Sequence, residues 1–517
     1  MYWADKIADE IIKSEKHKPY WIDDMKTPSG YAHIGSLLGP VIHSTIFRAL
    51  KRREMESTFT FVINDFDPVD GLPAEMMDEY GKYMGFPLKT TPSPDQKFES
   101  MADYYANDFT NAFRSLGVEA ELLSSWSLYH EGKFDEVIKT ALDKAEKIAD
   151  IYQKVAGSQK RQADWLPFQV ICEKCGKLGT TRVYDWNGEK VSYKCEPNLV
   201  EWAEGCGVEG KISPFGGAGK LPWKVDWAAH WKVIGVTIEG AGKDHASAGG
   251  SYDIAMVLCK EVFNYPQPYK LPYEFILFGG RKMSSSKGIG LKAHDLVKIV
   301  PPSVGRFLLI KGDIKSQSNF DPVGMAIPNL FDNYDKAASS FWEGKDDNLA
   351  KAFEYAQVDG KMPKKHFLPR FVDVARHLQD AKIEVNEKFE EIKGEPLSYV
   401  ERQTLKERIK YARAWLTEYA PEEEVFAIGK KPPDEAQALT NEQMEYLKKV
   451  RTLLGQKWTS PEDLQTALYN AVKETDIPAK EAFAGIYLVL IGKSHGPKAA
   501  WFLTENLKEA KKRLRQF

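Results

Sequence analysis

The strongest constraint on the fold is a strand, a turn and a helix expected near the start of the chain. Residues 20–22 have the aromatic and branched side chains of a short strand, a turn follows through Gly30, and residues 33–53 have the periodicity of an amphipathic helix. His33 would then lie at a helix N-terminus, where free backbone N–H groups and the helix dipole favour a bound phosphate. Gly30 and Gly35 have no side chains to keep a nucleotide from the backbone. This segment predicts an α/β nucleotide-binding fold.

A second segment, residues 282–288, reads Lys-Met-Ser-Ser-Ser-Lys-Gly and follows a predicted strand at residues 274–278. Its composition is typical of a flexible loop. Lys282 and Lys287 would supply mobile ammonium groups to the β- and γ-phosphates of a nucleotide, and the serine hydroxyls would add hydrogen-bond donors. The loop therefore indicates chemistry at a phosphate, which needs positioning and positive charge more than covalent catalysis.

Together, residues 27–36 (Thr-Pro-Ser-Gly-Tyr-Ala-His-Ile-Gly-Ser) and residues 282–288 resemble the two signature motifs, HIGH and KMSKS, of class I aminoacyl-tRNA synthetases. The resemblance implies amino-acid activation, in which the substrate carboxylate attacks the α-phosphate of ATP and pyrophosphate leaves. Ser36 stands where the first motif usually has His or Asn, and Ser285 stands where the second motif usually has its second lysine. The second departure leaves the division of work between the two loop lysines open.

The composition is that of a soluble globular protein. Hydrophobic residues make up 43% of the 517 residues and charged residues 28%, and the length suits three or four domains. The first residues lack the basic and apolar regions of a signal peptide, and no apolar run is long enough to span a membrane. We therefore expect a cytoplasmic enzyme with no membrane partner. The formal charge of −3 does not favour nucleic acid, so RNA binding would rely on local basic runs such as residues 51–53 and 508–515.

Four of the five cysteines fall in one short stretch: Cys172, Cys175, Cys195 and Cys206. Glycines directly follow two of them, as tight metal-binding turns prefer. Four thiolates in a cytosolic protein suit a tetrahedral structural Zn²⁺ better than disulfides. The uneven spacing leaves a reduced, metal-free insertion as the alternative. The fifth cysteine, Cys259, lies in an apolar helix pattern and is expected in the core.

The order of the predicted elements divides the chain into regions. Strand and helix patterns alternate at first, with a buried strand at residues 59–65 and a charged amphipathic helix at residues 135–157. A stretch rich in Cys, Gly and Trp interrupts this alternation, which resumes with an expected strand at residues 233–238. We expect the first half of a Rossmann-type catalytic domain at 1–158, a zinc-binding insertion with four cysteine ligands at 159–220, the second half of the catalytic domain at 221–300, a helical connective region at 301–390 and a C-terminal helical domain at 391–517.

Further segments narrow the family. Residues 221–227 (Leu-Pro-Trp-Lys-Val-Asp-Trp), 242–245 (Gly-Lys-Asp-His) and 272–275 (Pro-Tyr-Glu-Phe), with the cysteine insertion, resemble class I lysyl-tRNA synthetases. Residues 491–497 are similar to the last domain of that family and of glutamyl-tRNA synthetases. The resemblance covers essentially the whole chain. It implies an α/β Rossmann-type class I synthetase catalytic domain with a zinc-binding insertion, an all-α C-terminal domain that binds the anticodon, and tRNA-Lys, lysine and ATP with Mg²⁺ as partners.

The same resemblance assigns roles to individual residues. The implied catalytic residues are His33, Lys282 and Lys287. The implied ATP-binding residues are Pro28, Ser29, Gly30, His33, Gly35, Ser36, Gly242, Asp244, Lys282, Met283, Ser284, Ser285, Ser286 and Lys287. The implied amino-acid pocket contains Thr27, Trp223, His245 and Tyr273.

A lysine pocket also needs apolar walls for the methylene stem and a carboxylate for the ammonium group. Trp223, Trp227 and Tyr273 offer such walls. Asp226 lies between two tryptophans and ranks first among the carboxylates as a hypothesis. The alternative is that this Trp-rich stretch is simply core or a domain hinge. The full set of candidate carboxylates is Asp24, Asp226, Glu239 and Glu274.

Three other functions compete with lysine charging. A glutamyl-tRNA synthetase would need an arginine for its substrate carboxylate, and residues 221–245 contain none. A tRNA-binding relative without charging activity would be expected to lack one of the motif residues, all of which are present. A nucleotidyltransferase that acts on a small molecule would have no use for the long helical C-terminal region. The sequence leaves the oligomeric state open, with a monomer favoured.

Overall fold

The computed structural model describes residues 1–157, 164–283, 290–379, 383–426, 428 and 432–517. The chain forms two compact units. The first comprises Met1–Asp321 and Lys336–Pro363, and the second comprises Pro322–Asp335 and Lys364–Phe517. Every residue expected at the activation site belongs to the first of these units.

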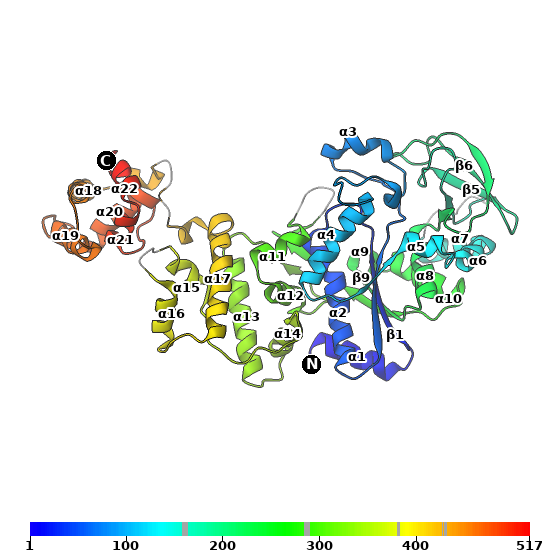
Figure 1. Ribbon diagram of the computed structural model, residues 1–517, viewed down its shortest axis with the longest axis horizontal. Coiled ribbons are helices and arrows are strands. Elements are labelled where there is room, and N and C mark those ends of the chain that lie inside the picture. The colour runs from blue at the N-terminus through cyan, green and yellow to red at the C-terminus, as the bar shows by residue number, and fades with distance from the viewer. Residues whose placement is uncertain (158–163, 284–289, 380–382, 427, 429–431) are drawn as a thin grey trace. The chain divides into compact units, whose positions relative to one another are not determined.

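The first unit is built on a five-stranded sheet, of which β1 and β9 are labelled in Figure 1. All neighbouring strands in this sheet run parallel. Their carboxyl ends therefore meet at one edge, where ligands of open α/β sheets bind. The expected α/β nucleotide fold is confirmed. The strand order is β10 (Tyr269–Tyr273), β9 (Ile238–Gly242), β1 (Tyr20–Lys26), β2 (Ser57–Ile63) and β3 (Glu121–Ser124).

Helices cover the sheet and pack against it with their apolar sides. Nearly all of α2 (Leu38–Lys51) is buried, and it packs on β1, β2 and β9. The amphipathic helix α1 (Trp3–Ser14) covers α2 in turn, near the N-terminus marked in Figure 1. The other helices of this unit are α3 (Met77–Tyr80), α4 (Met101–Ser115), α5 (Ser125–His130), α6 (Asp135–Asp143), α7 (Ala145–Ala156), α8 (Trp223–Ile234), α9 (Lys243–Ala246), α10 (Ser251–Glu261), α11 (Leu296–Ile299), α12 (Pro302–Ile310) and α14 (Asn348–Ala356).

Two predicted helices have different bounds in the structure. The helix expected from residue 33 begins as a 3-10 helix, Ile34–Leu37, and α2 starts only at Leu38. His33 therefore precedes the 3-10 helix rather than an α-helix. The helix expected at residues 135–157 is divided at Lys144 into α6 and α7.

The strand predicted at residues 233–238 is wrong. α8 continues to Ile234, Gly235 ends it with a φ of 93°, and β9 begins only at Ile238. Most of α8 is buried, so its apolar residues lack the one-sided periodicity that distinguishes a surface helix from a strand. The strand predicted at residues 274–278 is shorter, because only Ile276–Phe278 forms β11.

Small sheets make up the rest of the first unit. β5 (Thr181–Trp186), β6 (Val191–Cys195) and β7 (Glu209–Ile212) form an antiparallel sheet within the cysteine-rich stretch. β4 (Gln169–Val170) pairs with β8 (Gly219–Lys220), where this stretch leaves and rejoins the helical core. A third small sheet contains β11, β12 (Arg281–Lys282) and β13 (Ser318–Asn319).

Among its described residues, the second unit contains helices and no strands. Its C-terminal helices, coloured orange to red in Figure 1, share a hydrophobic core of their own. The helical C-terminal region is thereby confirmed. No helix in the described parts of the chain is long and apolar enough to cross a membrane. The helices that follow α14 are α15 (Phe371–His377), α16 (Val385–Lys393), α17 (Tyr399–Glu418), α18 (Asn441–Leu454), α19 (Pro461–Lys473), α20 (Ala479–Ile491), α21 (Ala499–Glu505) and α22 (Leu507–Leu514), while α13 (Ala326–Trp342) precedes α14.

Candidate activation site

The structure joins the two motifs through the backbone. The Ile34 N–H donates a hydrogen bond to the Leu291 carbonyl at 2.9 Å, and the Ala293 N–H donates to the Ala32 carbonyl at 2.8 Å. His33 thus pairs with Lys292 in an isolated antiparallel bridge. The chain that follows the second motif is therefore held against the first motif.

A cavity of about 280 Å³ opens at the carboxyl ends of β1, β9 and β10. It brings together predicted residues that are distant in the sequence. Ligand binding at this edge is the behaviour expected of an open parallel sheet. The predicted residues that line the cavity are Asp24, His33, Gly35, Ser36, Gly242, Asp244, His245, Tyr273, Glu274, Lys282 and Met283.

In the described part of the chain, the His33 ring has an unpaired nitrogen beside the cavity. Its Nδ1 is buried and has no hydrogen-bond partner among the described residues. A Cβ atom on Gly35 would lie 3.0 Å from this ring and 3.0 Å from the Met283 methyl group, so a larger residue would displace one of them by a few tenths of an ångström. Burial, with a smaller effect from the positive charge of Lys26, lowers the pKa of His33 to about 4. The imidazole is therefore neutral at pH 7.

The role of Gly30 differs from that of Gly35. Nothing lies within 4 Å of a Cβ built on Gly30, whereas the space beside Gly35 is filled by protein atoms. The sequence predicts that a nucleotide approaches the backbone closely at both glycines. At Gly35 the atoms that lie close to the backbone belong instead to the protein's own His33 and Met283 side chains. Pro28 is buried, and Ser29 lines a neighbouring cavity together with Thr27.

Lys282 is held at the mouth of the cavity by Asp244. Its Nζ lies 2.6 and 2.5 Å from the two oxygens of that carboxylate and 4.7 Å from the centroid of the Phe275 ring. Both members of the ion pair are about half exposed, 56% for Lys282 and 49% for Asp244. Four other predicted residues, Ser284, Ser285, Ser286 and Lys287, lie outside the described residues.

Aromatic side chains form a second group beside the cavity. The Trp223 and Trp227 rings stack with centroids 6.1 Å apart, and the His245 ring lies 5.3 Å from the first and 6.0 Å from the second. Trp223 also lines a larger adjoining cavity of about 680 Å³, which contains Thr27 and Asp67. The predicted amino-acid pocket is thus divided between two neighbouring cavities.

Asp226 is not placed to bind a substrate, which corrects its first rank among the carboxylates. It is 1% exposed, and its oxygens already lie 3.0 Å from Lys220 Nζ, 2.5 Å from the Tyr129 hydroxyl and 3.3 Å from His230 Nδ1. Burial opposes ionisation, but His230 and Lys220 outweigh it and lower the pKa of Asp226. The whole stretch belongs to α8, so Trp227, the next residue, points about 100° away from Asp226, whereas Trp223 lies one turn earlier on the same side of the helix.

The sequence interpretation missed the cation that neutralises Asp226. The Nζ of Lys220 also lies 2.6 Å from Asp67 Oδ1 and 2.6 Å from Asn64 Oδ1, and Asp67 Oδ2 accepts a hydrogen bond of 2.6 Å from Thr27. This buried network connects the first motif to α8. The polar residues that follow β2 are the sequence signal that marks it, since loops at the carboxyl ends of parallel strands commonly carry site residues.

Comparisons with known proteins show the family. The sequence matches the family model described as "tRNA synthetases class I (K)" over residues 1–359. It is 33% identical over 527 residues to a lysine–tRNA ligase of Methanocaldococcus jannaschii, covering 97% of each chain. It is 31% identical over 525 residues to a lysine–tRNA ligase of Methanosphaera stadtmanae, covering 97% of this chain and 96% of the relative. The chain belongs to the class I lysyl-tRNA synthetase family.

A distant likeness among solved structures extends over the same length. A glutamate–tRNA ligase from Elizabethkingia meningosepticum aligns with 96% of this synthetase and 99% of that chain, at 12% identity and a TM-score of 0.42.

The cysteines of this synthetase gather as the sequence predicts. The sulfur atoms of Cys172, Cys175, Cys195 and Cys206 all lie within 4.8 Å of one another, and none of these four is in a disulfide. The measured sulfur pairs are 3.6 and 3.7 Å apart. A tetrahedral zinc with Zn–S bonds of about 2.3 Å requires sulfur separations of about 3.8 Å. The donor set and its spacing therefore fit Zn²⁺. Cys259 is fully buried in α10, as expected.

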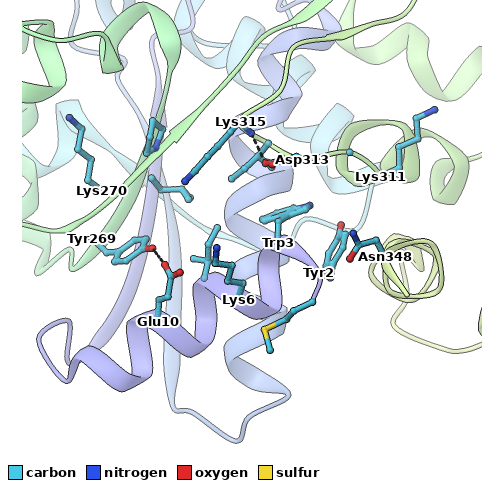
Figure 2. Close-up of a pocket in the computed structure, with 16 residues that line it drawn as sticks. Tyr2, Trp3, Lys6, Glu10, Tyr269, Lys270, Lys311, Asp313, Lys315 and Asn348 are labelled. Carbon is cyan, nitrogen blue, oxygen red and sulfur yellow. Dashed lines mark hydrogen bonds between the residues drawn. The ribbon is translucent and has the colours of Figure 1, made fainter. Parts of the chain in front are cut away.

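A further cavity of about 310 Å³ lies between α1 and the amino end of β10 (Figure 2). There the Trp3 indole N–H and the Tyr2 hydroxyl both donate to the Ile310 carbonyl, at 3.0 and 2.7 Å, and the Tyr269 hydroxyl donates to Glu10 at 2.8 Å. The described residues that line this cavity include none of those predicted for activation. The predicted activation residues named above line the cavity at the opposite, carboxyl edge of the sheet instead.

Proposed function

We propose that this synthetase attaches lysine to tRNA-Lys. It would activate lysine with ATP to lysyl-adenylate, releasing pyrophosphate, and transfer the lysyl group to the 3′ end of the tRNA. The observation that carries the proposal is the cavity at the carboxyl edge of the sheet. It is lined by His33 and Gly35 from the first motif and by Lys282 from the second, in a chain that belongs to the class I lysyl-tRNA synthetase family.

The chemistry needs little covalent help from the protein. A carboxylate oxygen of lysine attacks the α-phosphorus, and the bond from that phosphorus to the bridging oxygen breaks as pyrophosphate leaves. His33, whose ring Nδ1 is unpartnered among the described residues, would donate to phosphate oxygens, and Lys282 would exchange Asp244 for the β- and γ-phosphates. Lys287 would share that task. Mg²⁺ would accompany ATP through the phosphate oxygens.

Lysine carries two ammonium groups, and three carboxylates line the same cavity: Asp24, Glu274 and Asp244, of which the last is paired with Lys282. Asp24 is buried beside Gly39 and Tyr273. Glu274 has one oxygen, Oε2, that is buried without a partner among the described residues, while the other accepts from Lys243 at 2.6 Å. We propose these two as the groups that meet the substrate. Glu239 is less suitable, because the Trp227 and Trp231 indoles already occupy its oxygens. Thr27, Trp223, Trp227, His245 and Tyr273 would supply the walls of the lysine pocket.

The remaining regions have supporting roles in this proposal. Zn²⁺ held by the four clustered cysteines at 159–220 would be structural, since four thiolates leave no open coordination position. It would stabilise the insertion between the catalytic halves at 1–158 and 221–300. The connective region at 301–390 would contact the tRNA stem, and the helices at 391–517 would bind the anticodon. We propose a monomer that works in the cytoplasm, where its tRNA substrate is found.

The test is charging of unfractionated tRNA with labelled lysine and, in parallel, with labelled glutamate. We expect the purified chain to attach lysine alone. Attachment of glutamate would assign the pocket to another substrate, and attachment of neither would make the chain a tRNA-binding relative. A Lys282→Met variant serves as the matched negative control, because it retains most of the side-chain length and removes the charge.

A further inference from the structure

Lys26 is a cation in the activation cavity that belongs to neither signature motif. It is the last residue of β1, directly before the turn of the first motif, and its half-buried side chain lines the cavity with His33 and Lys282. The strand places it there, because Lys26 is paired with Ile63 at the carboxyl end of β2. Its position is therefore set by the sheet.

Among the residues that the structure describes, the ammonium group of Lys26 has no anionic partner. No carboxylate oxygen in the described ranges lies within 4.0 Å of its Nζ, and no hydrogen bond from it to them is formed. Its recorded contact is the Phe109 ring, whose centroid lies 5.8 Å away. Burial lowers the pKa of Lys26, while the charge of Asp24 acts in the opposite direction.

Two other lysines of this region, Lys220 and Lys282, each have an anionic partner. Lys220 is buried and paired with Asp67 and Asp226, and Lys282 is paired with Asp244. A partly buried charge without a partner is unfavourable, and an anionic ligand in the cavity would supply the missing partner. The cavity thus contains a cation for which the described part of the chain supplies no anion.

Amino-acid activation places negative charge at one point in particular. As the lysine carboxylate attacks, charge accumulates on the non-bridging oxygens of the α-phosphate, while the second motif serves the β- and γ-phosphates. His33 is neutral at pH 7 and donates only a hydrogen bond. Beside the Mg²⁺ that would accompany ATP, the cavity supplies Lys26 as a positive charge for the α-phosphate.

We propose that Lys26 donates hydrogen bonds to the non-bridging oxygens of the α-phosphate and is a catalytic residue for adenylate formation. The inference rests on the proposed function. The reaction itself is unchanged: the carboxylate oxygen forms a bond to the α-phosphorus, the bond to the bridging oxygen breaks, and pyrophosphate takes the electron pair. Lys26 keeps its proton throughout and stabilises charge that grows in the transition state.

The test compares two steps in Lys26→Met and Lys26→Arg. Methionine keeps the packing on Phe109 and removes the charge. We expect kcat for lysine-dependent ATP–pyrophosphate exchange, measured with and without tRNA, to fall on the order of 10²-fold in Lys26→Met. Lys26→Arg should recover most of this loss. Transfer of lysine from isolated lysyl-adenylate to tRNA should slow as well in Lys26→Met, because the α-phosphate also gains negative charge as AMP leaves.

Lys270→Met is the matched control, since Lys270 lies at the start of the same sheet's edge strand and pairs with Asp253 away from the cavity. Its exchange rate should match wild type. Exchange in Lys26→Met within two-fold of wild type, a rise in the lysine KM alone, or a loss explained by a lower melting temperature would each overturn the proposal. Failure of the wild-type protein to exchange or charge with lysine would instead refute the proposed function and leave Lys26 without its reaction.

Discussion

The ammonium group of Lys282 lies 2.5 and 2.6 Å from the two carboxylate oxygens of Asp244, which joins a residue of the second motif to α9, the short helix that follows β9. Both side chains are about half exposed, so water screens the pair and its net free energy is about 0–1 kcal/mol. Phosphate oxygens carrying a larger charge can therefore displace Asp244. The pair would hold Lys282 near its working position before ATP arrives.

This ion pair predicts that replacing Lys282 lowers the exchange rate strongly, whereas replacing the neighbouring Arg281 lowers it weakly. In Lys282→Met we expect kcat for ATP–pyrophosphate exchange to fall by about 10²-fold or more, because a charge that contacts the leaving phosphates is lost. Arg281→Met is the control: Arg281 precedes Lys282 on β12, and neighbouring strand residues point to opposite faces. Equal losses in the two variants would contradict a specific role for Lys282.

Gly35 and Gly30 form a second matched pair. A Cβ on Gly35 would lie 3.0 Å from the His33 ring and from the Met283 methyl group, whereas a Cβ on Gly30 would meet nothing within 4 Å. We expect Gly35→Ala to lower kcat for exchange by about tenfold or more, since displacement of catalytic groups by a fraction of an ångström is costly. The unfolding midpoint should change little. Gly30→Ala should lose less activity, and the reverse order would count against the assigned position of His33.

Asp226→Asn should reduce stability rather than lysine affinity. The change leaves the buried ammonium of Lys220 with one carboxylate in place of two, and breaking a buried ion pair costs about 3–5 kcal/mol. We expect urea unfolding to show a loss approaching this size, with the lysine KM unchanged in the folded enzyme. Asp185→Asn, which affects an exposed pair 3.9 Å from Lys211, should change stability by less than about 1 kcal/mol. A raised lysine KM at normal stability would return Asp226 to the pocket.

Metal content distinguishes the clustered cysteines from the isolated one. We expect about one zinc per chain in protein purified without chelators, and loss of that zinc with lower thermal stability in Cys206→Ser. Cys259→Ser should retain the metal, because this thiol lies in α10 outside the cluster. Zinc analysis of the two variants shows which cysteine binds the metal. Full metal content in Cys206→Ser would remove this residue from the ligand set.

The acid stability of the protein should depend on His33. Its folded-state pKa of about 4 lies below the usual 6.5, so the unfolded chain binds more protons between these values. Stability contributed by the neutral ring is present above pH 6.5 and is lost as the pH falls towards 4. We expect NMR titration of the ligand-free protein to place the His33 ring near pH 4. In His33→Gln, the part of the pH dependence of the unfolding free energy that lies between pH 4 and 6.5 should disappear. A His33 ring that titrates near pH 6.5 would contradict the buried environment.

Short-range features of the chain were predictable from its sequence. The strand before Thr27, the glycine at position 35 and the close spacing of Cys172 and Cys175 are local patterns that follow from backbone and ligand geometry. The strand expected at residues 233–238 failed for a local reason as well. A helix buried on nearly all sides has no polar face, so its apolar run has the composition of a buried strand.

By itself, the sequence determined the nucleotide-binding fold, the two phosphate motifs and the cysteine cluster, because each depends on residues that are close in the chain or on a strand–turn–helix unit. Only the tertiary structure decided which charges are already neutralised. Lys220 reaches Asp67 and Asp226 from different elements, while Lys26 reaches no carboxylate in the described parts of the chain. Such pairings depend on the order of strands in the sheet and on which loops meet at its carboxyl edge, and these relationships join residues far apart in the sequence.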